Sequence, residues 1–141
     1  MIHEFSTTHV GSLLRPEYLL NAFSEYSAGK LPREDFEKIL ETAVRSVVKA
    51  QVKTAIDEVN DGEYNRLIFF GGLTSLPGFA PNMFPLEFSA SDVYRQPMVT
   101  GKIEYNARNP AIALEVGKVK DALKELNSQK RVKVTFQAHL S

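Results

Sequence analysis

The chain has 141 residues, no cysteine, 17 basic and 17 acidic side chains and 43% hydrophobic residues, a composition typical of one ordinary globular domain. A net charge of zero gives no field to attract a polyanion, and the lack of cysteine excludes disulfides and thiolate metal ligands. No apolar run approaches the roughly 18 to 20 residues of a membrane span, so we expect a cytoplasmic protein with no nucleic-acid or membrane partner.

The first part of the chain predicts one strand and two helices. Residues 4–13 are rich in β-branched and aromatic side chains and break at a Gly-Ser pair, which favours a short strand followed by a loop. Residues 17–28 place apolar side chains at helical spacing and end before Gly29, so a helix is expected there. Residues 33–55 show the strongest helical periodicity, with an apolar stripe made by Phe36, Ile39, Leu40, Ala43, Val44, Val47 and Val48.

The second part predicts three more strands and one helix. Residues 56–60 resemble a strand that ends in an acidic Asp-Gly-Glu turn. The segment 64–96 is rich in proline, glycine and phenylalanine, and we expect it to be a long, partly structured loop with an apolar surface. Residues 97–105 and 131–138 are predicted to be strands, separated by a helix that begins after Asn109-Pro110.

Strands that alternate with helices favour an α/β fold with parallel strands and right-handed crossovers. We interpret residues 1–141 as a single domain in which 64–96 is a long loop region. In parallel α/β folds, the loops after the carboxyl ends of the strands carry the functional site. This rule selects residues 9–15, 61–66 and 139–141.

The chemistry of two of these loops suits an amino-acid ligand. The Gly11-Ser12 turn offers backbone N–H groups and a hydroxyl, which can hold a carboxylate or a phosphate. Glu63, if it lies at the same mouth, can hold an ammonium group. One cluster of donors and one carboxylate are what the zwitterion of an α-amino acid requires.

Each candidate also has a purely structural interpretation. The Gly-Ser pair and the acidic turn at 61–63 could be ordinary solvated turns, and His9 could be a hydrogen-bonded rim residue. Arg15 and Arg66 could bind an anion or pair with a neighbouring acid. The three histidines lack zinc-site spacing, and no dinucleotide-binding, P-loop or nucleophile-elbow motif occurs.

Two motifs taken together resemble the cobalamin-independent methionine synthase family, and in particular its short single-barrel members. They are STTHVGSLLRPEYLL at residues 6–20 and QVKTAIDEVNDGEYNR at residues 51–66. PMVTGKIEYN resembles the third barrel strand of that family and VKVTFQAHLS the fourth. The resemblance therefore extends over nearly the whole chain.

The resemblance implies a (β/α)8 barrel that transfers a methyl group from a methyl-folate to the thiol of homocysteine in methionine biosynthesis, with zinc activating the thiolate. It implies that Val10, Gly11 and Ser12 hold the homocysteine carboxylate and that Glu63 holds its amino group. Secondary site candidates in the same motifs are His9, Arg15, Asp61 and Arg66.

The family's zinc ligands, a histidine, two cysteines and a carboxylate, come from later strands, and this sequence stops after what resembles strand four. The folate-contacting Arg-Cys pair of the family has no match at residues 92–95. We therefore expect the first half of a TIM barrel, with about four parallel strands and their helices, in the superfamily of methionine synthase and uroporphyrinogen decarboxylase. We expect no catalytic or metal-binding residue in this chain, no activity of the chain alone, and either self-association or a missing C-terminal half.

Two alternatives remain open at this point. The chain could be a non-catalytic binding or assembly module with a half-barrel fold, in which the phenylalanine-rich segment is an interface. It could also be another zinc thiol transferase or a decarboxylase-like member of the superfamily, whose ligand need not be an amino acid. Glu63 favours a ligand with an amino group, because a ligand without one leaves the carboxylate unpaired.

Overall fold

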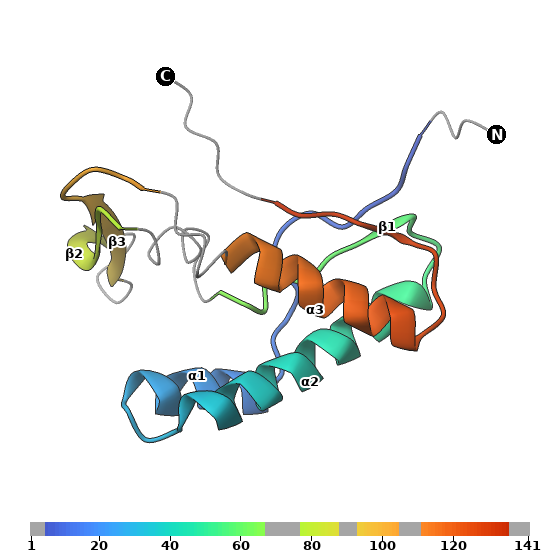
Figure 1. Cartoon of the computed structure of the whole chain (residues 1–141), viewed down its shortest axis with the longest axis horizontal. Coiled ribbons are helices and arrows are strands. Elements are labelled where there is room, and N and C mark those ends of the chain that lie inside the picture. The colour runs from blue at the N-terminus through green and yellow to red at the C-terminus, as the bar shows by residue number, and fades with distance from the viewer. Residues whose placement is uncertain (1–4, 67–76, 88–92, 105–110, 136–141) are drawn as a thin grey trace. The chain divides into compact units, whose positions relative to one another are not determined.

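The structure is a computed structural model in which residues 5–66, 77–87, 93–104 and 111–135 are described (Figure 1). The chain forms two compact units. The larger unit comprises Met1–Leu67 and Ala113–Phe136, and the smaller comprises Ile68–Ile112 and Gln137–Ser141.

A small parallel sheet organises the larger unit. Strand β1 (Glu58–Val59) pairs in parallel with β4 (Arg131–Val132), and on its other side Thr8 forms a parallel bridge with Glu58. Three chain segments that are far apart in sequence therefore run side by side in the same direction (Figure 1). The larger unit is thus an α/β unit with parallel strands, as the alternation of elements predicts.

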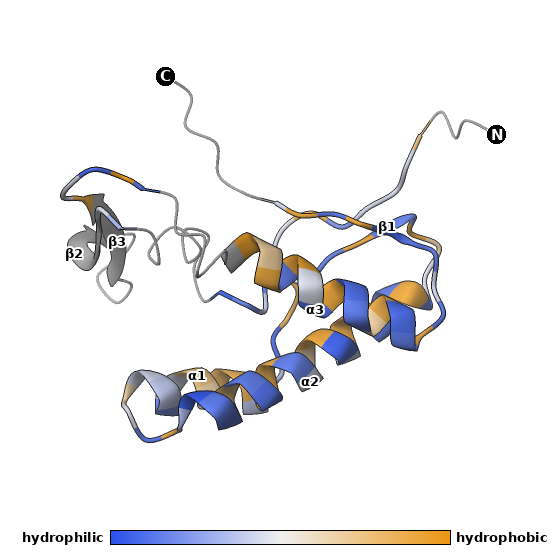
Figure 2. Ribbon diagram, in the orientation of Figure 1, coloured by the Kyte–Doolittle hydropathy of each residue, from blue (hydrophilic) through white to orange (hydrophobic). Residues whose placement is uncertain are grey.

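Three helices accompany the sheet: α1 (Glu17–Ser27), α2 (Arg33–Val52) and α3 (Ala111–Glu125). Each of α1 and α2 begins directly after a proline, whose fixed φ suits the start of a helix. After α1 the backbone turns at Gly29 with φ +69°, a left-handed conformation that glycine adopts without steric cost. The helices are amphipathic, with their hydrophobic residues grouped on one side (Figure 2).

The core of the larger unit lies where the apolar faces of the helices meet β1. Leu19 of α1, Val44 and Val48 of α2, Val59 of β1 and Val119 of α3 are fully buried. Beside them, the rings of Phe23 and Tyr26 contact Phe36, with centroid distances of 5.0 and 4.5 Å. The core thus uses the apolar stripe that predicted α2.

The predicted helices are confirmed with small changes of boundary. The helix expected over 33–55 ends at Val52, because the backbone turns before entering β1. The strand expected over 56–60 is reduced to β1 at Glu58–Val59. The strand expected over 131–138 is reduced to β4 at Arg131–Val132: residues 133–135 are not in a strand, and residues 136–138 lie outside the described part. The strand expected over 4–13 is reduced to the bridge at Thr8.

The segment 64–96, predicted to be a partly structured loop, contains most of an antiparallel hairpin. The smaller unit contains β2 (Phe79–Glu87) paired antiparallel with β3 (Val93–Val99). Two prolines in β2 concealed it, and the pairing register shifts between Ala80 and Phe84. A two-stranded ribbon has only edge strands, where proline and bulges are tolerated.

The same hairpin corrects the predicted third parallel strand. Of residues 97–105, only 97–99 are in a strand, and that strand belongs to the hairpin. The parallel neighbour of β1 is β4 instead. The described residues therefore show three parallel segments where about four were expected.

None of the helices in the described ranges combines the length and the apolar character required to cross a membrane.

Leu19 and Leu20 provide a matched test of this core. Leu19 is 0% exposed and Leu20 is 46% exposed on the same helix. Leu19→Ala should lower the free energy of unfolding by about 2–5 kcal/mol, because truncation leaves a cavity, whereas Leu20→Ala should change it by less than about 1 kcal/mol. Urea denaturation followed by circular dichroism measures both, and equal losses would contradict this packing.

Candidate functional site

The candidate site lies where the parallel segments of the larger unit end. The carboxyl ends of parallel strands meet at one edge of a sheet, so the loops that follow them come together. Two of the three loops selected from the sequence, 9–15 and 61–66, are described and are in contact. The third, residues 139–141, lies outside the described residues.

Ser12 and Glu63 face each other across these two loops. The Ser12 hydroxyl donates a hydrogen bond to Oε2 of Glu63 at 2.6 Å, although the two residues are 51 positions apart. The backbone supports this contact, because the Leu13 N–H donates to the carbonyl of Gly62 at 3.1 Å. The fold thus brings together the two residues that the zwitterion argument singled out.

The turn at residues 10–12 presents unused donors. Val10, Gly11 and Ser12 are all exposed, and Gly11 has φ +87°. Within the described part of the chain, none of their three backbone N–H groups donates a hydrogen bond. These amides are therefore available to an anionic group from solvent, whereas the Ser12 hydroxyl already donates to Glu63.

The acidic loop is shaped by its own side chains. Asn60 Oδ1 accepts the N–H of Gly62 at 2.8 Å, and Asp61 Oδ1 accepts the N–H of Glu63 at 3.0 Å. Asp61 Oδ2 also accepts the side-chain amide of Asn65 at 2.7 Å. These contacts make Asp61, a secondary site candidate, part of the scaffold of the loop.

Two consecutive residues of this loop are left-handed. Gly62 has φ +66° and Glu63 has φ +59°. The positive φ favours glycine at position 62, and a Cβ there would also make tight contacts of 3.2 Å with Leu13 and Tyr64. Glu63 has no such freedom, and a non-glycine residue at positive φ is a form of local strain that concentrates at functional sites.

Arg15 connects the first loop to the second. Its Nη2 donates to the carbonyl oxygens of Glu63 at 2.9 Å and Arg66 at 2.6 Å. The Tyr64 hydroxyl makes a neighbouring contact, donating to the Leu14 carbonyl at 2.6 Å. Burial is the main cause that raises the pKa of Tyr64, which keeps that hydroxyl protonated and able to donate.

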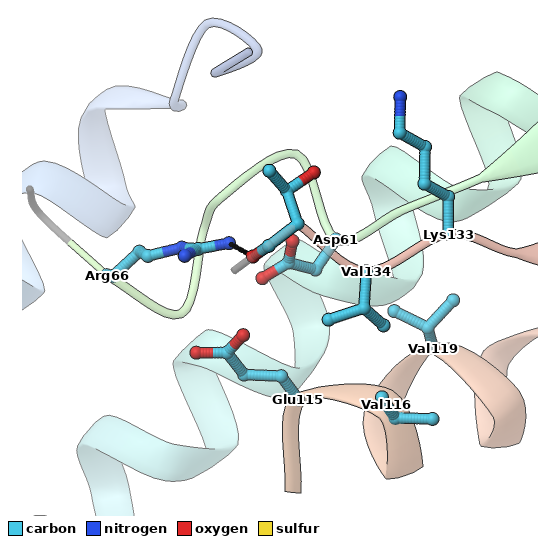
Figure 3. Close-up of a pocket in the computed structure, with 8 residues that line it drawn as sticks. Asp61, Arg66, Glu115, Val116, Val119, Lys133 and Val134 are labelled. Carbon is cyan, nitrogen blue, oxygen red and sulfur yellow. Dashed lines mark hydrogen bonds between the residues drawn. The ribbon is translucent and has the colours of Figure 1, made fainter. Parts of the chain in front are cut away.

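Two further cations connect these loops to the third segment. Arg66 donates to the carbonyl of Thr135 at 3.0 Å (Figure 3), and Lys133 donates to the carbonyl of His9 at 3.1 Å. Together with Arg15 they form what we term the cationic ring: Arg15, Arg66 and Lys133. Each segment supplies one cationic donor and accepts one from another segment.

His9 is used locally. Its Nε2 lies 2.6 Å from the carbonyl oxygen of Gly11, so the ring donates its proton to that carbonyl. This contact matches the structural interpretation of His9 as a hydrogen-bonded rim residue.

A small pocket lies behind the acidic loop, against α3. In Figure 3 the carboxylates of Asp61 and Glu115 and the guanidinium of Arg66 point toward one another. Glu115 is 9% exposed, and burial, followed by the charge of Asp61, raises the pKa of its carboxyl group. The remaining residues that line this pocket are Val116, Val119, Lys133, Val134 and Thr135.

Sequence reasoning did not find Glu115 or Lys133. Glu115 lies on α3, and its distance from the acidic loop depends on how that helix packs. Lys133 occupies an alternating polar position that looks like a solvated strand residue. Neither has a local sequence signal, because both contacts form only when distant segments meet.

The residues described do not fit a zinc site. Among residues 5–66, 77–87, 93–104 and 111–135, no group of three or more His, Asp or Glu side chains could hold a metal ion, and the sequence contains no cysteine. Ser12 supplies a hydroxyl and Glu63 a single carboxylate, which is a donor set for an organic ion and not for tetrahedral zinc.

Comparison with known proteins gives a consistent set of relatives. No protein-family model matches the chain. It is 33% identical to a methionine synthase of Sulfolobus acidocaldarius over 138 residues, which is 92% of this chain and 37% of that protein. It is 33% identical to a methionine synthase of Saccharolobus solfataricus over 112 residues, 77% of this chain and 32% of that protein.

A solved structure shares the fold. It is from Listeria monocytogenes, with a provisional assignment as a vitamin B12-independent methionine synthase, and it aligns with a TM-score of 0.62 and 22% identity. The alignment covers 93% of this chain and 40% of that one. This chain therefore spans less than half the length of each of these three relatives.

The raised pKa of Glu115 predicts a pH-dependent stability. Because the folded state holds that proton more tightly than the unfolded chain, the free energy of unfolding falls as pH rises from the ordinary value of 4.5 through the raised pKa. Glu115→Gln removes this titration, so its stability relative to wild type should increase across that interval.

Urea denaturation at a series of pH values measures the effect. Glu41→Gln, at an exposed position of α2, controls for the loss of one negative charge. A difference between Glu115→Gln and wild type that stays constant with pH would show that the carboxyl group is not buried in this way.

Proposed function

We propose that the Ser12–Glu63 site binds the amino-acid end of homocysteine for cobalamin-independent methyl transfer. The chain belongs to the methionine synthase family. The observation that carries the proposal is the contact between the Ser12 hydroxyl and the Glu63 carboxylate at 2.6 Å. The amino and carboxylate groups of an α-amino acid share one carbon atom. A site that holds both groups needs its donor and its acceptor side by side.

The charges at the site support an ammonium ligand. Among the described residues, the Glu63 carboxylate contacts only the Ser12 hydroxyl and has no cationic partner. An ammonium group beside Oε1 or Oε2 would neutralise it with a charge-assisted hydrogen bond. The Ser12 hydroxyl can then turn its hydrogen toward the carboxylate of the ligand, joined by the unused N–H groups of Val10 and Gly11.

The role of this chain is binding and orientation. When a metal ion is bound in a complete methyltransferase, it lowers the pKa of the substrate thiol and so produces the thiolate nucleophile. The described residues contain no donor set for that ion. We therefore assign this chain the homocysteine site, and propose that zinc and methyl-folate chemistry requires further residues from a C-terminal half or from a second copy.

The alternative of a carboxylate or sulfonate ligand without an amino group has less support. Such a ligand could use the Val10–Ser12 turn equally well. It would leave the Glu63 carboxylate without a cationic partner and would place the negative charge of the ligand beside it, which is unfavourable. A non-catalytic binding module would bind the same ligand at the same site. It would differ from the enzyme half only in the assembly that the chain forms.

Isothermal titration with L-homocysteine and L-methionine tests the binding site. Glu63→Gln keeps the shape and an acceptor for Ser12 but removes the charge, so affinity should fall by about tenfold to a hundredfold. Glu41→Gln, exposed on α2, is the matched control and should bind as wild type does. Absence of binding by wild type, or equal affinity of wild type and Glu63→Gln, would overturn the proposal.

The proposed need for further residues predicts association. Within the described residues, β4 and the segment at Thr8 each pair with β1 on one side only, which leaves hydrogen-bonding edges. Size-exclusion chromatography with light scattering should therefore give species above 15.8 kDa. A well-folded, monodisperse monomer of that mass would count against self-association.

A further inference from the structure

We propose that Arg15 is a positioning residue that sets the specificity of the site for ligands with an amino group, by holding the backbone of Glu63. The inference rests on the proposed function and adds a residue to it. Arg15 donates to the carbonyl groups of Glu63 and Arg66, at the end of the acidic turn and three residues beyond it, and not to Ser12 or the Glu63 carboxylate.

The conformation of Glu63 explains why such a holder is needed. At φ +59°, Glu63 is in a region that costs a side-chain-bearing residue energy. When its carbonyl is released, Glu63 is freer to leave the left-handed conformation, which relieves the strain and moves the carboxylate away from Ser12. The hydrogen bond from Arg15 Nη2 to this carbonyl, at 2.9 Å, opposes that change and is shorter than the bond from the N–H of Arg66 to the same oxygen, at 3.3 Å.

Other contacts hold the acidic loop when Arg15 is lost. The carbonyl of Gly62 accepts from Leu13, and the side chain of Tyr64 donates to Leu14, so the loop stays attached to the first loop.

At Glu63 itself, the N–H still donates to Asp61 Oδ1 at 3.0 Å, and the carbonyl keeps only the longer bond from the N–H of Arg66, at 3.3 Å. The expected consequence of losing Arg15 is a change at Glu63, with the loop still docked.

The environment of Arg15 is not one that maximises stability. Its Nε is buried and has no hydrogen-bond partner among the described residues. A guanidinium that loses water at one nitrogen without gaining an acceptor contributes less to stability than a fully paired one. Instead, one nitrogen of Arg15, Nη2, donates to two carbonyl groups of the loop that carries Glu63.

The test measures specificity instead of affinity alone. L-Methionine and its des-amino analogue 4-(methylthio)butanoate differ only in the amino group, so the ratio of their dissociation constants reports how well Glu63 is placed. We expect wild type to prefer methionine by tenfold or more. In Arg15→Met this preference for methionine should fall about tenfold, while the des-amino analogue should bind as it does to wild type.

Two further variants separate positioning from general stability. Tyr64→Phe removes the neighbouring contact between the same two loops, the one to the Leu14 carbonyl, and should keep the wild-type ratio. Arg15→Lys retains a charged donor on a shorter chain and should restore part of it. The inference is overturned if Arg15→Met keeps the full ratio, or if Tyr64→Phe loses as much.

A measurement without ligand keeps this inference separate from the proposed function. The Glu63 carbonyl shares its peptide group with the N–H of Tyr64. In the ¹⁵N heteronuclear NOE, the amide of Tyr64 should become mobile in Arg15→Met, while the amides of Leu13 and Gly62 remain rigid because they keep their own acceptors. Tyr64→Phe should leave the amide at position 64 rigid. If wild type binds neither ligand, the proposed function fails, and the NOE at position 64 still decides whether Arg15 holds the Glu63 carbonyl.

Discussion

The arrangement of the site depends on charged side chains that bind backbone carbonyl groups across segment boundaries. Loops at the ends of strands leave carbonyl oxygens that no ladder satisfies, and here cationic donors take that role. Arg15, Arg66 and Lys133 each donate from one segment to another, and the resulting cationic ring closes on itself. Charge-assisted hydrogen bonds are stronger than neutral ones, so three short parallel segments keep a defined geometry at their carboxyl ends.

Within that frame the residues of the Asp-Gly-Glu turn have distinct tasks. Asp61 binds backbone and side-chain amides of its own loop, and Gly62 allows a left-handed turn where a Cβ would make tight contacts with Leu13 and Tyr64. Glu63 is thereby displayed toward Ser12 at the cost of a strained backbone. The Asp61 carboxylate is thus used within its own loop, and Glu63, two positions on, presents the accessible carboxylate.

Sequence reasoning succeeded where the signal is local and periodic. The apolar stripe of α2 predicted both a helix and the face that it buries, because helical periodicity and burial have the same cause. It did not identify β2 and β3, whose prolines suggested a partly structured loop. Residues 97–105 were expected to form a parallel strand, whereas residues 97–99 belong to an antiparallel hairpin, because pairing depends on contacts that no local pattern encodes.

For the site, the sequence by itself determined which chemical groups are present: a Gly-Ser turn and a carboxylate. It also led to the expectation that the ends of strands bring these groups together. Tertiary structure decided which groups are free to act. It placed Ser12 against Glu63, engaged Asp61 and His9 in their own loops, and brought Glu115 and Lys133 to the site from distant segments. The reason is physical: residue type sets what a group can donate or accept, but whether it is already satisfied depends on neighbours that are remote in sequence and that only packing supplies.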